Sequence, residues 1–206
     1  MFASLAGVLF DGFAYGMLLF LLSVGLSVTL GMMNFVNLAH CSFAMVGAYA
    51  TFSLASKHGW PFLATLPMAF VAAAAISLVL ERTRFGAQVR AAVDNQRMAR
   101  GLGIDVDRAF MFTFALGGGL AGLGGALSIQ MVGLDPTFAL GYLVYVLIVV
   151  AVGGLGSIGG SFAAAVVLGI SDMAGKYYFP WLGAFLIYLV MVALLMWRPA
   201  GLFGKR

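Results

Sequence analysis

The sequence predicts an all-α polytopic membrane protein with about six to seven membrane helices, and two observations carry that prediction. Of the 206 residues, 63% are hydrophobic and only 9% are charged, whereas a soluble domain carries about 25% charged residues. Most of the charge is confined to one interior segment, 81–108, between two long and nearly uncharged stretches. A bilayer accommodates this pattern when the charged segment lies outside the hydrocarbon.

Each predicted membrane helix is an apolar run bounded by polar or glycine-rich residues. A span needs about 20 apolar residues, and 139–152 and 161–174 are each only about 14 residues long. The predicted spans are 5–30, 37–56, 61–80, 109–132, 139–152, 161–174 and 179–197.

The two short spans are joined by a glycine-rich break at 153–160. Two interpretations are open: the spans meet at a turn, or they form a re-entrant hairpin whose irregular backbone lines a polar cavity. The charged segment divides the chain into three parts: an N-terminal three-helix segment (1–80), a cytoplasmic coupling loop (81–108) and a C-terminal membrane segment (109–206) with a basic tail.

Positive residues favour the cytoplasmic side of a membrane, so the arginine-rich loop and the tail at Arg198, Lys205 and Arg206 are expected on the same side. Four crossings separate them if the glycine-rich break reverses the chain. We therefore predict a multi-pass protein of the cytoplasmic (inner) membrane, with the N-terminus outside and the C-terminus cytoplasmic.

The coupling loop contains signals for short helices with defined ends. Asp94 or Asn95 can cap a helix N-terminus, and Gly101 or Gly103 can close one. Asp105 is placed to cap the span that follows. The alternative is a simple solvated loop whose arginines serve only the membrane topology.

Three motifs, in the same order, resemble the permeases of branched-chain amino acid ABC importers. The first includes Asn37-Leu38-Ala39-His40 and Gly47-Ala48-Tyr49; the second runs from Arg84-Phe85-Gly86 through Arg90-Ala91, Asn95 and Ala99 to Gly103-Ile104; the third is the glycine-rich break. Together they cover nearly the whole chain.

The resemblance implies a non-enzymatic permease subunit with no catalytic residues, cofactor or metal. It implies an importer for branched-chain or similar hydrophobic amino acids, driven by cytoplasmic ABC ATPase subunits and completed by a second, identical or similar permease subunit. An extracytoplasmic substrate-binding protein and membrane lipid are the other expected partners, and nucleic acid is not one. The sequence itself agrees that ATP is hydrolysed by a separate chain, because it lacks the G-x-x-x-x-G-K-[ST] loop that binds the phosphates of ATP.

Two sets of residues are predicted to carry the function. The ATPase-coupling residues are Arg90, Ala91, Asn95, Ala99, Gly101 and Gly103, and the translocation-path candidates are Asn34, Asn37, His40, Gly153, Gly154, Gly156 and Ser157. A structural turn at the glycines, and a structural hydrogen bond at His40, are the competing interpretations.

The sequence departs from the family pattern at two places. An internal segment of about two spans is missing near 82–83, and Cys41 stands where the motif usually has glycine. The gap raises an alternative function, a shortened scaffold that binds the ATPase without moving solute. An ion-coupled carrier is disfavoured, because paired intramembrane ionisable groups are not found.

Several other motifs have ordinary explanations. Gly154 to Gly159 matches the dinucleotide pattern G-x-G-x-x-G, but its flanks are membrane helices, so nucleotide binding is not expected. The small residues between Gly118 and Gly125 predict close helix packing. Asp11 and Asp172 lie near predicted span ends, where a carboxylate is expected to reach interfacial water.

Overall fold

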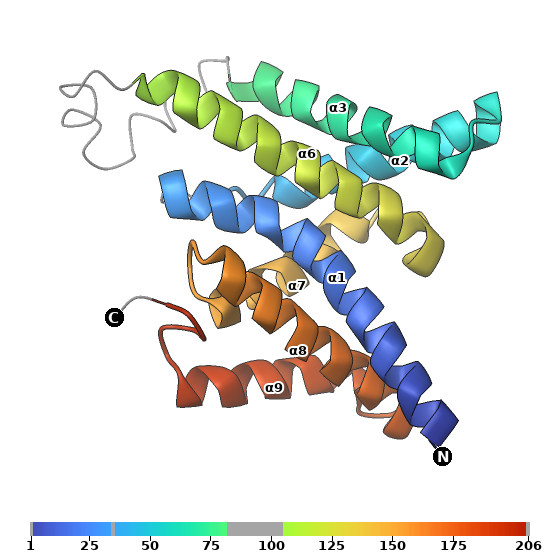
Figure 1. Cartoon of the computed structure of the whole chain (residues 1–206), viewed down its shortest axis with the longest axis vertical. Helices are drawn as coiled ribbons and strands as arrows, with labels where there is room; N and C mark the ends of the chain where they lie inside the picture. Colours follow the sequence, from blue (N-terminus) through green and yellow to red (C-terminus); the bar gives the residue numbers. More distant parts are fainter. Residues whose placement is uncertain (1, 34–35, 82–104, 205–206) are drawn as a thin grey trace.

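The computed structural model describes residues 2–33, 36–81 and 105–204, and within them every regular element is an α-helix (Figure 1). The predicted all-α fold class is confirmed for this part of the chain. The helices are α1 (Phe2–Met33), α2 (His40–His58), α3 (Phe62–Glu81), α6 (Val106–Val132), α7 (Phe138–Gly153), α8 (Ile158–Tyr178) and α9 (Gly183–Trp197).

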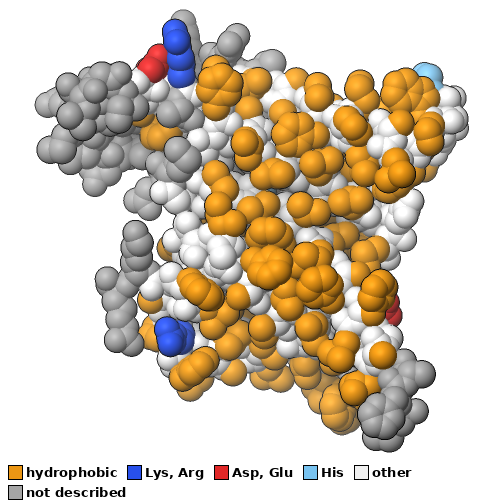
Figure 2. All heavy atoms as spheres, viewed as in Figure 1, with side chains coloured by type: hydrophobic (Ala, Val, Ile, Leu, Met, Phe, Trp, Pro, Cys, Tyr) orange, Lys and Arg blue, Asp and Glu red, His pale blue; other side chains and the backbone are white. Residues whose placement is uncertain are grey.

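Three of the described helices are long and apolar enough to cross a membrane: Leu5–Gly31, Val106–Val132 and Ile158–Tyr178. Shorter apolar helices cover Phe62–Ile76, Phe138–Gly153 and Phe185–Trp197. Hydrophobic side chains cover most of the face that α1, α3, α6 and α8 present in Figure 2, and the charged side chains visible there lie near its edges. Such a surface suits a lipid environment.

The structure corrects the predicted length of one helix. We expected a short span at 161–174, but α8 has 21 residues and is one of the three candidate spans. Ser157 starts the helix earlier by accepting a hydrogen bond from the Gly160 N–H at 3.1 Å, and an ion pair between Asp172 and Lys176 lies in its last turns. The other short span remains short, since α7 has 16 residues.

The glycine-rich break reverses the chain, as four crossings between the basic loop and the basic tail require. α7 ends at Gly153, α8 begins at Ile158, and the two helices pack against each other. The residues between them form a turn in which Gly154 and Gly156 have φ values of 97° and 77°. Left-handed backbone of this kind favours glycine.

The arrangement of the chain ends agrees with the predicted number of crossings. In Figure 1 the C-terminal end of α3, the N-terminal end of α6 and the C-terminus lie at one end of the helices, whereas the N-terminus lies at the opposite end. The side that faces the cytoplasm remains a prediction.

Close packing of small residues explains how the helices approach one another. On α6, a Cβ at Gly122 would overlap Ala73 of α3, and a Cβ at Gly125 would overlap the Ala44 carbonyl of α2. On α1, a Cβ at Gly16 would lie 2.8 Å from the Ala165 carbonyl oxygen of α8. The predicted packing role of the α6 glycines is therefore confirmed.

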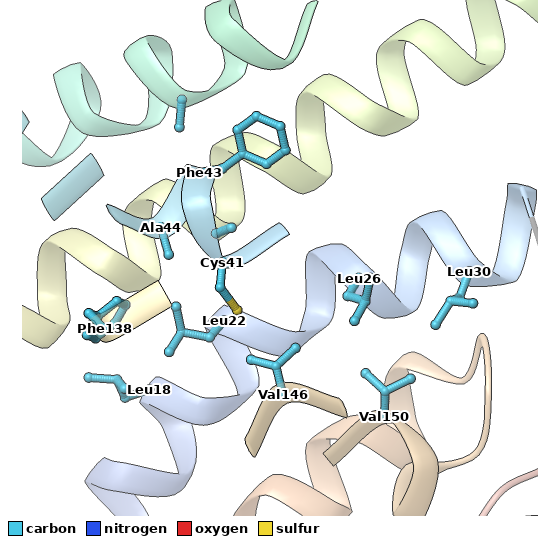
Figure 3. Close-up of a cluster of buried hydrophobic side chains, with 12 residues drawn as sticks. Leu18, Leu22, Leu26, Leu30, Cys41, Phe43, Ala44, Phe138, Val146 and Val150 are labelled. Carbon is cyan, nitrogen blue, oxygen red and sulfur yellow. The ribbon is translucent and has the colours of Figure 1, made fainter. Parts of the chain in front are cut away.

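One buried hydrophobic cluster joins α1, α2, α3, α6 and α7 (Figure 3). Cys41, which is 1% exposed, points into this cluster beside Leu22 and Val146. The thiol therefore fills space in an apolar core, where a small hydrophobic side chain stabilises the packing.

Candidate functional site

The predicted coupling residues all lie outside the described residues. What the structure describes is the start of the helix that follows them. Asp105 caps α6 by accepting a hydrogen bond from the Arg108 N–H at 3.1 Å, and it pairs with the Arg108 guanidinium at 2.9 Å. The predicted cap is confirmed, so the chain enters α6 in a fixed direction directly after the coupling loop.

The Asn37–His40 region enters the interior of the bundle. Asn34 lies outside the described residues, but Asn37 is buried and its Oδ1 accepts a hydrogen bond from the Ala39 N–H at 3.0 Å. This side chain shapes the turn that leads into α2, as an Asx turn does.

His40 is 1% exposed, and its Nε2 lies 2.9 Å from the carbonyl oxygen of Leu22 in α1. Gly25 leaves room for the imidazole, because a Cβ there would lie 2.8 Å from His40 Cε1. The histidine thus makes the structural hydrogen bond that the sequence favoured.

The contact between His40 and Leu22 shows how deep in the bundle α2 begins. Leu22 lies eleven residues before the end of α1 at Met33, or about 16 Å along the helix. α2 therefore begins at mid-depth rather than at the membrane surface. Its N-cap residue, Ala39, makes no side-chain cap hydrogen bond. In a bilayer, non-helical backbone at this depth occurs where it is buried in protein or lines a polar cavity.

The glycine-rich turn lies at a different level. A Cβ at Gly156 would lie 2.7 Å from Gly31 Cα, which places the turn against the last residues of α1. Between the two levels, the Ser27 and Ser161 hydroxyls of α1 and α8 share a buried hydrogen bond of 2.5 Å. Those path candidates that the structure describes are thus not gathered into one cluster; they lie at two heights along α1.

The C-terminal segment closes the glycine-rich turn. The Leu202 N–H donates to the Val152 carbonyl at 2.7 Å, and the Phe203 N–H donates to the Gly153 carbonyl at 3.1 Å. Gly154 is also in close contact, because a Cβ there would lie 2.5 Å from the Gly204 nitrogen. The turn is held in place by the chain's own tail, which favours its structural interpretation.

A further polar cluster was missed by sequence reasoning. Asp172 was expected to reach interfacial water, but it is 1% exposed, so that expectation is wrong. The physical reason is Lys176, one turn later, whose ammonium lies 2.5 Å from Asp172 Oδ2. The i, i+4 spacing of these two residues was the available signal.

Comparison with known proteins supports the resemblance. A family model described as the permease component of the branched-chain amino acid transport system matches residues 8–81 and 68–195. Its two matched stretches overlap at 68–81, just before the position of the predicted internal gap.

Curated relatives agree with the family model. The chain is 33% identical over 169 residues to a probable branched-chain amino acid transport permease protein, LivH, of Methanocaldococcus jannaschii, covering 77% of this chain and 53% of that protein. It is 27% identical to LivH of Escherichia coli K12 over 66% of this chain and 45% of that protein, and 27% identical to BraD of Pseudomonas aeruginosa over 63% and 43%. The chain spans about half the length of these relatives, and no solved structure matches it significantly.

Proposed function

Because this chain belongs to the family of branched-chain amino acid transport permeases, we propose that it is one permease subunit of an ATP-driven importer. The proposed substrates are branched-chain or similar hydrophobic amino acids, and the proposed location is the cytoplasmic membrane. The observation that carries the proposal is the family match along most of the chain, together with an apolar helical bundle.

The proposed path passes the interrupted start of α2. The start of α2 lies beside the middle of α1, and its N-cap residue, Ala39, makes no side-chain cap hydrogen bond. In transporters, the N-terminus of a half-helix at this depth can face an anionic group of the substrate. Asn34, Asn37 and His40 are proposed to border this part of the path, and the glycine-rich turn is proposed as a fixed support for the end of α1.

The proposed energy source is a separate ABC ATPase that docks on the coupling residues between Arg90 and Gly103. A second permease subunit would complete the cavity, and an extracytoplasmic binding protein would deliver the amino acid. Ala99→Asp in the coupling loop is expected to reduce ATPase binding, whereas Lys205→Ala in the tail is the matched control. Co-purification of the ATPase with each variant measures the difference.

The deciding experiment is ATP-dependent leucine uptake into vesicles that contain the reconstituted complex. Uptake that requires ATP supports the importer. The second candidate, a non-transporting scaffold, is favoured by the internal segment missing near 82–83. ATPase binding without uptake would support the scaffold and contradict the importer.

The proposed topology can be tested with a membrane-impermeant maleimide after the sole cysteine is replaced by Cys41→Ala. His58→Cys is expected to react in intact cells, because His58 is the exposed last residue of α2, at the proposed outer side. Asn95→Cys is expected to react only after the membrane is permeabilised. Labelling of Asn95→Cys in intact cells would reverse the proposed orientation.

A further inference from the structure

The ion pair near the C-terminal end of α8 leaves one buried carboxylate oxygen without a partner. Asp172 is 1% exposed, and its Oδ2 accepts the hydrogen bond from Lys176 Nζ. Its other oxygen, Oδ1, is buried and accepts no hydrogen bond from the described residues. A carboxylate oxygen in this position is costly unless a positive or hydrogen-bonding group meets it.

Three tyrosines lie close enough to Asp172 to interact with its charge: Tyr15 of α1, and Tyr142 and Tyr145 of α7. Tyr188 of α9 stacks beside Tyr145, and we call the four side chains the tyrosine row. Tyr15 and Tyr142 share a side-chain hydrogen bond. The ring centroids of Tyr142 and Tyr145 are 5.7 Å apart, and those of Tyr145 and Tyr188 are 6.4 Å apart. Aromatic faces attract cations.

The site already holds one ammonium group, that of Lys176, which lies 5.3 Å from the centroid of the Tyr15 ring. The lysine side chain is 49% exposed, so its head can withdraw into the surroundings. Its backbone is fixed, because a Cβ at Gly183 of α9 would lie 2.8 Å from Lys176 Cα. Withdrawal of the side chain would uncover Asp172 without a movement of the helix, but the carboxylate would then need another cation.

The surroundings also suit an aliphatic group. Tyr15 belongs to the buried cluster that contains Leu19, Leu168 and Ile187. The ion pair lies towards the C-terminal end of α8, on the same end of the molecule as the N-terminus (Figure 1). This is the end proposed above to face outward.

We propose that Asp172 and the tyrosine row bind the ammonium group of the transported amino acid, and that Lys176 is a tethered occupant which the substrate displaces. The inference rests on the proposed function, which supplies the amino acid. Exchange of one ammonium for another keeps the buried carboxylate paired throughout, so the step avoids an uncompensated charge. The branched aliphatic side chain would pack against the neighbouring apolar cluster.

Thermal unfolding of the purified full chain tests this directly with three probes: leucine, isopentylamine, which lacks the carboxylate, and 4-methylpentanoate, which lacks the ammonium. Leucine and isopentylamine are expected to raise the Tm in a concentration-dependent way, and 4-methylpentanoate is expected to have no such effect. Asp172→Asn is expected to raise the half-saturating leucine concentration by about tenfold or more, as loss of a charge-assisted hydrogen bond predicts. Lys176→Gln is expected to lower it, because the competing ammonium is removed.

The matched control is Asp11→Asn, which removes an exposed carboxylate of α1 and is expected to leave the response unchanged. An equal response of Asp172→Asn and the wild type would overturn the inference, as would an equal effect of 4-methylpentanoate and leucine. If Asp172→Asn does not fold, Lys176→Gln decides, since an unchanged or weaker response there contradicts displacement. If leucine uptake requires ATP but leucine binding does not depend on Asp172, this inference is overturned and the proposed function stands. If leucine binding depends on Asp172 but no uptake occurs, the proposed function is overturned instead.

Discussion

Gly169→Ala tests whether α1 and α8 are held together by direct backbone contact. A Cβ at Gly169 would lie 2.5 Å from both the Cα and the nitrogen of Gly16, whereas ordinary van der Waals contact begins at 3.4 Å. Both neighbouring atoms belong to the backbone of α1, so relief requires the two helices to separate by about 0.9 Å.

The expected change in the free energy of unfolding of Gly169→Ala is the sum of two opposing effects. Overpacking a close contact costs about 1–3 kcal/mol, and rigid backbone atoms place this site near the upper end. Replacing glycine by alanine within a helix stabilises the helix by about 1 kcal/mol. The net loss of about 2 kcal/mol corresponds to a fall in Tm of about 4–8 °C for a chain of this size.

Gly159→Ala in the same helix is the matched control, because a Cβ there meets no atom within 4 Å. It is expected to raise the Tm slightly through helix propensity alone. Both variants can be measured by thermal unfolding of the purified protein in detergent. Equal Tm values for the two variants would refute the contact between α1 and α8.

Three further predictions concern the polar and glycine contacts along α1. His40→Phe is expected to destabilise the protein by about 1 kcal/mol, because the hydrogen bond to α1 is lost, and to reduce uptake; unchanged uptake would remove this residue from the proposed path. Ser27→Ala and Ser161→Ala, measured singly and together by thermal unfolding, are expected to show a coupling energy of about 1 kcal/mol, and additive effects would contradict the shared hydrogen bond. Gly156→Ala is expected to cost about 1–2 kcal/mol or more, because it forces a left-handed conformation on alanine; a Tm equal to that of the wild type would argue against the turn geometry.

The order of the helices was predictable from the sequence because each apolar run has its own boundaries. The reversal at the glycine-rich break was also predictable, since the basic segments at 82–108 and at the C-terminus needed an even number of crossings between them. The length of α8 was not, because Gly159 and Gly160 looked like helix breakers. A serine cap and packing against α7 and α1 outweigh the weak intrinsic preference of glycine.

The candidate site was less predictable than the fold. His40 was identified because histidine is rare in membrane helices, but its partner, a carbonyl oxygen of α1, has no sequence signature. The tyrosine row was missed for a similar reason. Its members come from α1, α7 and α9, and only the packing of these helices brings them together and places three of them near Asp172. Residues of this kind carry no local pattern, so tertiary structure is needed to find them.

The pairing of α1 with α8 affects the order in which contacts form while the chain is synthesised and inserted into the membrane. Ser27 and Ser161 are separated by 134 positions along the chain, and synthesis at about 5–20 residues per second takes roughly 7–27 s to cover that distance. During this interval the glycine face of α1 lacks its contact with α8, and the Ser27 hydroxyl must find another partner. The contact between α1 and α8 can therefore form only after most of the chain has been synthesised and α8 has entered the membrane.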